Sequence, residues 1–163
     1  MSDVVDLILA DHRQFHEALR QLRSGETDRE AALADFSHLL VAHSEAEETE
    51  VYPALRKLAD VDDGEVDHGA AEHLEGHRAL LELLEASESG SSDWDRKLER
   101  VAEVVSHHLA EEERTLLADA REALATPQLN KIGQAFMNTR KQRLDEGCGR
   151  IEYIRDLIQQ HQG

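Results

Sequence analysis

The sequence contains few of the residues that form disulfide-rich or membrane-spanning proteins. Cys148 is the only cysteine, so no disulfide can form within the chain. No apolar run approaches the roughly 20 residues that a membrane-spanning helix needs. The acidic start also has too short an apolar run for a secretory signal peptide. These absences predict a cytoplasmic protein without a membrane partner.

Basic residues are also scarce, because 18 lysines and arginines face 35 aspartates and glutamates, which gives a net charge of −17. Such a charge repels nucleic acids and anionic membranes, so we expect neither as a partner. The charge is uneven: residues 127–163 carry six basic and four acidic side chains. This mildly basic tail either docks on the acidic body or forms a freely solvated helix.

Aromatic residues make up only 4% of the chain and it has two prolines, whereas strong helix formers such as Ala, Leu, Glu, Arg and Gln dominate. We therefore predict an all-α protein. The expected helices cover residues 3–23, 29–59, 69–87 and 94–125, followed by a region that GCG at 147–149 divides. Pro53 should bend the second helix or loosen its last turns, and residues 60–69 read as a linker. The predicted domains are a four-helix bundle over residues 1–126 and a C-terminal helical extension over residues 127–163 that packs on it.

The chain repeats itself, since its first two helices align with its third and fourth. Each half carries an HxxxH pair and then an HxxxE pair. The aligned pairs are His12 and His16 with His73 and His77, and His43 and Glu47 with His108 and Glu112.

Each of these polar pairs interrupts an apolar stripe, because residues four apart lie on one face of a helix. One such histidine is usually a hydrogen-bonded core residue, and one HxxxE is common in a glutamate-rich chain. Four pairs on four inward faces would cost several kcal/mol if they were unpaired. The pattern therefore predicts a metal cluster.

The kind of metal follows from the ligand types. The sequence has no HExxH motif and no set of thiolates, which argues against zincin, structural zinc and iron–sulfur sites. Its only ExxH, Glu65–His68, falls in the predicted linker. Imidazole-rich sites suit iron, copper, zinc or nickel. Two central glutamates that can bridge two ions favour a pair of irons.

The motifs DH at 11–12, HSEAEETEVYP at 43–53, EHLEGH at 72–77 and HHLAEEE at 107–113 resemble those of hemerythrin-like (HHE cation-binding) proteins. The resemblance covers about residues 3–125. It implies an antiparallel four-helix bundle of hemerythrin type around two oxo- or hydroxo-bridged irons. The predicted fold is this bundle with an additional C-terminal helical region. The implied metal ligands are His12, His43, Glu47, His73, His77, His108 and Glu112.

In that family pattern Glu47 and Glu112 would bridge the irons, and one iron would keep a position for dioxygen, peroxide or nitric oxide. Glu112 stands four residues after His108, where the invertebrate oxygen carriers have an aspartate five residues after it. This makes the pattern closest to bacterial and mycobacterial hemerythrin-like proteins.

Other polar residues near these motifs have different expected positions. His16 is an eighth ligand, a core residue or a group that contacts a ligand, and we favour the last. Glu50 is a second candidate for orienting a ligand. We expect Glu48 and Glu113 to face solvent, and Tyr52 to point away from the site unless Pro53 distorts the helix. No catalytic residue separate from the metal centre is predicted.

Two functions fit these residues. The first is a di-iron oxidoreductase of the catalase or peroxidase type that breaks down hydrogen peroxide, or performs related oxygen or nitric oxide chemistry with an unidentified electron donor. The second is a non-catalytic protein that carries or senses dioxygen, or stores iron.

Overall fold

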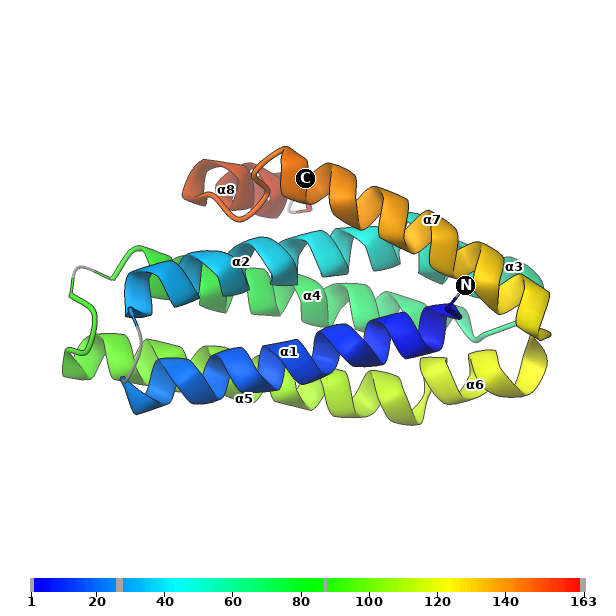
Figure 1. Ribbon diagram of the computed structural model, residues 1–163, viewed down its shortest axis with the longest axis horizontal. Helices are drawn as coiled ribbons and strands as arrows, with labels where there is room; N and C mark the ends of the chain where they lie inside the picture. The colour runs from blue at the N-terminus through cyan, green and yellow to red at the C-terminus, as the bar shows by residue number, and fades with distance from the viewer. Residues whose placement is uncertain (1, 26–27, 87, 162–163) are drawn as a thin grey trace.

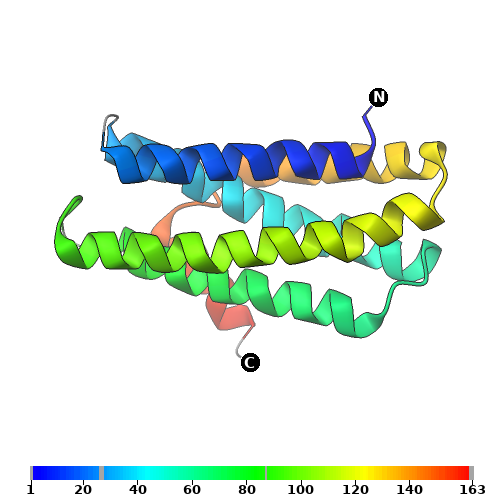
Figure 2. The ribbon, with the colours of Figure 1, turned by 90° about the horizontal axis from the view of Figure 1, so that it is seen from below.

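The computed structural model describes residues 2–25, 28–86 and 88–161, and within these ranges the regular structure is helical, without strands. Its elements are α1 (Val4–Ser24), α2 (Arg29–Ala46), the π-helix η1 (Glu47–Val51), α3 (Tyr52–Leu58), α4 (Asp63–Leu84), α5 (Ser92–Arg114), α6 (Leu116–Ala123), α7 (Thr126–Asp145) and α8 (Ile151–Gln160). Helices α1, α2, α4 and α5 run lengthwise, each opposite in direction to the one before (Figures 1 and 2). The predicted all-α bundle is confirmed.

Side-chain caps decide where several helices begin. The carboxylates of Asp3, Asp28 and Asp62 accept hydrogen bonds from N–H groups in the first turns of α1, α2 and α4. The cap at Asp62 starts α4 six residues before the predicted position, so the prediction of a linker over residues 60–69 is wrong from Asp63 onward. His68 therefore lies on a helix. Ser87, the predicted end of this helix, lies outside the described residues.

Two predicted long helices are interrupted. The second one changes to a π-helix at Glu47, and the fourth one breaks at Thr115, where φ is −107° and ψ is −85°. The hydroxyl of Thr115 donates to the carbonyl of Glu111 at 2.8 Å, which also accepts from the Thr115 N–H at 2.9 Å, and such a side-chain bond often bends a helix. Both interruptions lie within a turn of predicted metal ligands.

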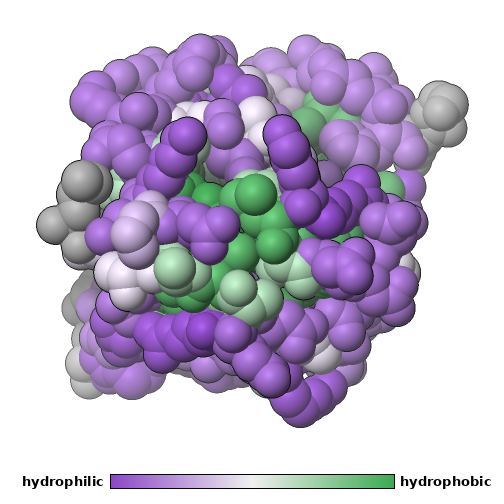
Figure 3. Space-filling view, turned by 90° about the vertical axis from the view of Figure 1, so that its right-hand side faces the viewer, coloured by the Kyte–Doolittle hydropathy of each residue, from purple (hydrophilic) through white to green (hydrophobic). Residues whose placement is uncertain are grey.

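The apolar core consists of two clusters. The first contains Phe15, Phe36 and Leu80, and the second contains Ile8 and Leu116. Along α1 and α2 the residues of one cluster are separated from those of the other by the segment that carries the polar pairs. At the end of the molecule where α3 and α6 lie, hydrophobic residues gather inside a ring of hydrophilic ones (Figure 3).

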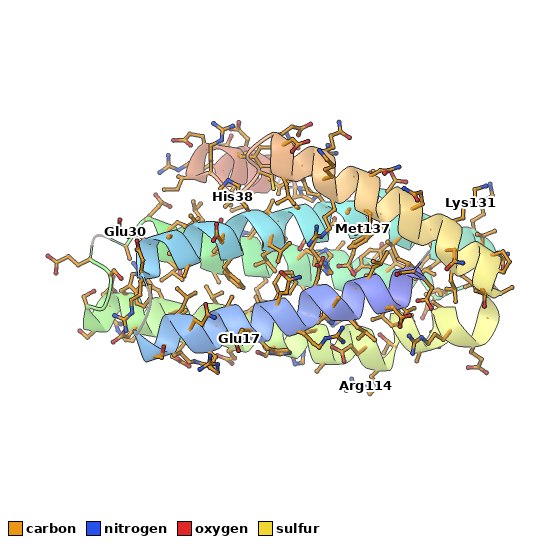
Figure 4. All side chains as sticks on the ribbon, viewed as in Figure 1. Glu17, Glu30, His38, Arg114, Lys131 and Met137 are labelled. Carbon is orange, nitrogen blue, oxygen red and sulfur yellow. The ribbon has the colours of Figure 1, made fainter. Side chains whose placement is uncertain are left out.

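The C-terminal helices pack on the bundle. Helix α7 contacts α1, α2 and η1, and α8 contacts α4. Gly147 takes a φ of +72° just after α7, which favours glycine. The turn then packs so closely on α2 that a Cβ at Gly149 would clash with the backbone of His38, which lies on the side of α2 toward these helices (Figure 4). Within the described part of the chain, no helix is long and apolar enough to cross a membrane.

We expect Cys148 to resist thiol reagents in the folded protein. Its side chain is fully buried, and burial raises the pKa of its thiol to about 12, so little of the reactive thiolate is present. A chromogenic thiol reagent should react fully only after urea is added. Rapid reaction of the native protein would show that the α7–α8 turn opens.

Candidate metal centre

The structure brings six of the seven predicted metal ligands into two adjoining groups. In each group the donor atoms lie within 4.8 Å of one another. The first group contains Glu47, His73, His108 and Glu112, and the second contains His12, His43 and Glu112. All six residues are buried. One polar layer therefore combines residues from α1, α2, η1, α4 and α5.

Two carboxylates connect the groups. Glu47 Oε1 lies 3.1 Å from the Nε2 atoms of both His43 and His73. Glu112 lies 3.2 Å from His12 Nε2 through one oxygen and 3.6 Å from His108 Nε2 through the other. These are the two residues that the sequence predicted as bridges, and each touches an imidazole of both groups.

Four of the histidines are oriented by a carboxylate on the outer side of their rings. In each pair Nδ1 faces a carboxylate oxygen, which leaves Nε2 directed into the layer. The pairs are His12 with Glu113 at 2.8 Å, His43 with Asp11 at 2.8 Å, His73 with Glu48 at 2.8 Å and His108 with Glu72 at 3.0 Å. This arrangement fixes the ring and the tautomer of a metal-binding histidine.

Two of those carboxylates have a role that the sequence-based prediction missed. Glu113 is exposed, as expected, whereas Glu48 is partly buried, and each accepts a hydrogen bond from a predicted ligand of another helix. A residue next to an inward one on a helix is rotated by about 100°, so its side chain can reach a neighbouring helix from the edge of the inward face. Glu48 follows Glu47 and Glu113 follows Glu112, so this spacing was the available signal.

Several potential metal-binding atoms in the layer lack a hydrogen-bond partner. The buried side-chain atoms without one include His12 Nε2, His43 Nε2, His77 Nε2, His108 Nε2, Glu47 Oε2 and Glu112 Oε1. Buried polar atoms are rarely left unsatisfied, and here they converge on one place. Imidazole nitrogens and carboxylate oxygens are ligands of first-row transition metals, so these residues fit a metal centre.

His77 is the seventh predicted ligand and lies on α4, one helical turn after His73. It is buried and lines a cavity of about 20 Å³ together with His43, His73 and His108. Such a volume holds roughly one water-sized group. Burial, followed by repulsion from His73, lowers the pKa of His77 to about 3. Its Nε2 therefore stays neutral, as a metal ligand must be.

The charges of the layer favour cations. Burial opposes protonation of His43, but Glu47 and Asp11 outweigh it and raise the pKa of His43 to about 10. The pKa of His73 is raised to about 10 in the same way by Glu47 and Glu48. Burial opposes ionisation of Glu47, yet the two imidazoles hold the pKa of this carboxyl well below its usual range. Positive charge in this layer is therefore stabilised by carboxylates on both sides.

Tyr52 is a residue of the site that the sequence placed on the far side of its helix. Its hydroxyl donates to Glu112 Oε2 at 2.5 Å and lies 3.5 Å from His73 Nε2. Burial and the negative charge of Glu112 raise the pKa of Tyr52 well above its usual value, so the hydroxyl keeps its proton. Its ring stacks on that of His73.

The π-helix explains this placement. Pro53 has no N–H group to continue the α-helical pattern, and the N–H of Tyr52 bonds to the carbonyl of Glu47, five residues back. The wider turn rotates Tyr52 toward the layer. Gly69 on α4 leaves room for the ring, because a Cβ there would lie 3.1 Å from the hydroxyl oxygen. Pro53 was the signal for this distortion.

Helix α7 of the C-terminal extension supports His43, which the sequence did not predict. Arg140 on α7 donates hydrogen bonds of 2.8 and 2.9 Å to the two oxygens of Asp11, which accepts from His43. Phe136, also on α7, packs its ring edge against His43. Helix α7 therefore helps to build the site.

The two candidates for orienting a ligand lie elsewhere. His16 is exposed, so the prediction that it faces inward is wrong. Phe15 takes the buried position beside it and contacts the rings of both His12 and His43. The carboxylate of Glu50 accepts a hydrogen bond from Thr139 of α7 at 2.9 Å and is not hydrogen-bonded to a predicted ligand.

Comparison with known proteins agrees with this geometry. Residues 3–120 match the hemerythrin HHE cation-binding domain, which is most of the chain. The chain belongs to this family. The HHE assignment makes it a cation-binding domain, and its histidine and glutamate layer is where a cation fits.

Two individual proteins are similar to this HHE chain. The crystal structure of a hemerythrin HHE cation-binding domain-containing protein from Mycobacterium kansasii superposes with a TM-score of 0.80 at 20% identity, and covers 95% of this chain and 99% of that one. A DNA nickase from a Nostoc species is 27% identical over 137 residues. This match covers 82% of the present chain but only 38% of the nickase.

Proposed function

We propose that this HHE protein holds two iron ions and breaks down hydrogen peroxide to water and dioxygen. The ligands would be His12 and His43 at one ion and His73, His77 and His108 at the other, with Glu47 and Glu112 shared. Two groups of donors joined by two carboxylates support a pair of ions rather than one.

The observation that favours peroxide chemistry is the polar approach to the centre. A cavity of about 410 Å³ reaches Glu112 and His108 and is lined otherwise by groups such as Glu65, His68 and Glu111. A dioxygen carrier protects its ligand in a dry, apolar pocket, whereas peroxide and water pass through a polar channel readily. This cavity therefore gives peroxide and water a polar route to the centre, which supports turnover of peroxide.

Breakdown of two peroxide molecules to two waters and one dioxygen requires two electrons to move between the peroxides and protons to move to the leaving oxygen. When bound, the paired irons would take up and return the two electrons. Tyr52 holds a proton on its hydroxyl, which donates to Glu112, and Glu112 lines the cavity. We assign to it the donation of one proton to the peroxide that is reduced, and to Glu112 the positioning of the hydroxyl. The second peroxide releases two protons as it is oxidised to dioxygen, and these supply the other proton of the reduction and restore the hydroxyl of Tyr52.

Tyr52→Phe tests this assignment. The variant should retain its iron, because the hydroxyl lies beyond the imidazole and carboxylate donors, while oxygen evolution from peroxide falls about 100-fold with the loss of a general acid. Iron content and oxygen evolution should be measured on the same preparation, with His16→Ala as an exposed control.

The opposing result would be an iron-loaded wild-type protein that reversibly forms a stable oxygen adduct and leaves peroxide untouched, which would favour the carrier. The proposal includes no nucleic-acid substrate, although one relative is a DNA nickase, because a chain of net charge −17 is repelled by DNA.

A further inference from the structure

A second cluster of histidines and glutamates lies on the surface beside the centre. His68 and Glu72 on α4 face His107 and Glu111 on α5. His68 Nε2 lies 3.5 Å from Glu72 and 3.3 Å from Glu111. His107 Nε2 lies 3.3 Å from Glu72 and 3.1 Å from Glu111. Each imidazole therefore contacts both carboxylates.

These distances suit a metal ion. Four ligands at about 2.0–2.1 Å from a tetrahedral ion are roughly 3.3 Å from one another. The four separations between imidazole and carboxylate run from 3.1 to 3.5 Å. Donor atoms of His68, Glu72 and Glu111 already lie within 4.8 Å of one another, and His107 contacts the same two carboxylates from α5 and would have to move toward the other three to share one cation. Two imidazoles with two carboxylates are a ligand set for first-row transition metals.

The spacing in the sequence is that of the buried centre. His68–Glu72 and His107–Glu111 are both HxxxE pairs, so each pair shares one helix face. His107 and Glu111 directly precede His108 and Glu112, and are therefore rotated by about 100° from the centre toward the surface. The outer cluster repeats the inner arrangement in a position that solvent reaches, with His68 and His107 54% and 68% exposed.

Glu72 and a cavity connect the two places. One oxygen of Glu72 accepts from His108 Nδ1 at 3.0 Å, while the other contacts the two outer histidines. The cavity of about 410 Å³ is lined by His68, Glu72 and Glu111 of the outer cluster and by His108 and Glu112 of the centre. A cation held by the outer cluster thus lies at the mouth of a polar passage to the buried ligands.

We propose that His68, Glu72, His107 and Glu111 bind a divalent first-row transition metal ion, and that this surface site loads the buried centre. Metal binding by this surface site does not depend on the proposed function. The loading role does rest on the proposed function, because loading requires that the buried centre takes up metal.

The binding is tested by titrating Co²⁺ into iron-loaded protein, in which the centre is already filled. Wild type should bind about one further ion, with the visible spectrum of low-coordinate cobalt. His68→Ala/His107→Ala should weaken this binding at least about tenfold while iron content stays the same. His16→Ala, which removes another exposed histidine, should bind cobalt like wild type. Equal cobalt affinity in the double variant and wild type would overturn the site.

A second preparation separates this proposal from the first. In Glu47→Gln/Glu112→Gln, which lacks both shared carboxylates, the surface ion should still bind. If wild type holds no iron but this variant binds cobalt through His68 and His107, the di-iron proposal fails and the surface site stands.

The loading role is tested by the rate of Fe²⁺ uptake. After treatment with a chelator, His68→Ala/His107→Ala should take up Fe²⁺ about tenfold more slowly than wild type, and an unchanged rate would refute the loading role.

Discussion

Glu112→Ala should lose nearly all of its iron, from about two ions per chain to well under one. Glu112 belongs to both donor groups, and its two oxygens approach His12 and His108 separately. Without it, the two groups are connected by Glu47 alone, and His12 and His108 lose the carboxylate that faces their Nε2 atoms. The unfolding temperature should fall with the metal content, because an ion bound only by the folded state stabilises it. Elemental analysis and calorimetry of the same samples measure both effects.

Glu50→Ala is the matched control for this experiment. Glu50 lies in η1 near the centre, but its carboxylate bonds to Thr139. It should keep its iron and lose only the modest stability of one hydrogen bond, about 1 kcal/mol. Full iron in Glu112→Ala, or equal losses in the two variants, would contradict the assignment of Glu112 as a shared ligand.

Asp11→Ala should be the most destabilising change away from the metal ligands themselves. The buried carboxylate of Asp11 accepts from His43 and from both donors of Arg140. Its removal leaves a guanidinium that is only 15% exposed without a partner, which typically costs about 3–5 kcal/mol. His43 also loses the bond that orients it, so iron affinity should fall about 10- to 100-fold. Urea unfolding and competition with a chelator measure the two quantities.

Arg143→Met separates this effect from a general weakening of α7. Arg143 lies on the same helix and pairs with Glu45 at 3.1 Å, away from Asp11. We expect it to leave iron affinity unchanged. Unaltered iron affinity in Asp11→Ala would show that His43 is held by its packing against Phe15 and Phe136 alone.

The bonds around Asp11 give the C-terminal extension a role in the metal site. The family match ends at residue 120, whereas Phe136 and Arg140 lie on α7 beyond it. Both act on His43, one through its ring and the other through Asp11. Truncation of this helix would therefore change the centre as well as the surface of the bundle.

The sequence by itself determined the bundle and the residues of its polar layer. Helix-forming residues and few prolines specify long helices, and a period of 3.6 residues places His43 with Glu47, and His108 with Glu112, on inward faces. Because these relations operate within one helix, they need no knowledge of its neighbours. The duplicated pattern then implied that four such faces meet.

Contacts between helices were decided only by the tertiary structure. Glu48 and Glu113 contact His73 and His12 because each neighbouring helix lies where a rotated side chain can reach it. Asp11 and Arg140 are 129 residues apart, and no local periodicity relates them. His16 turned outward because the packing of α1 gave the buried position beside it to Phe15.

The place of Tyr52 lies between these two cases. The sequence contains the cause, because Pro53 removes a backbone donor, but regular helix geometry places the ring on the far side. A helix that lacks one backbone N–H donor can end, bend or widen at that point, and the arrangement that buries its side chains best is the one that forms. Here the space above Gly69 and the acceptor on Glu112 stabilise the wider turn, and those groups come from α4 and α5.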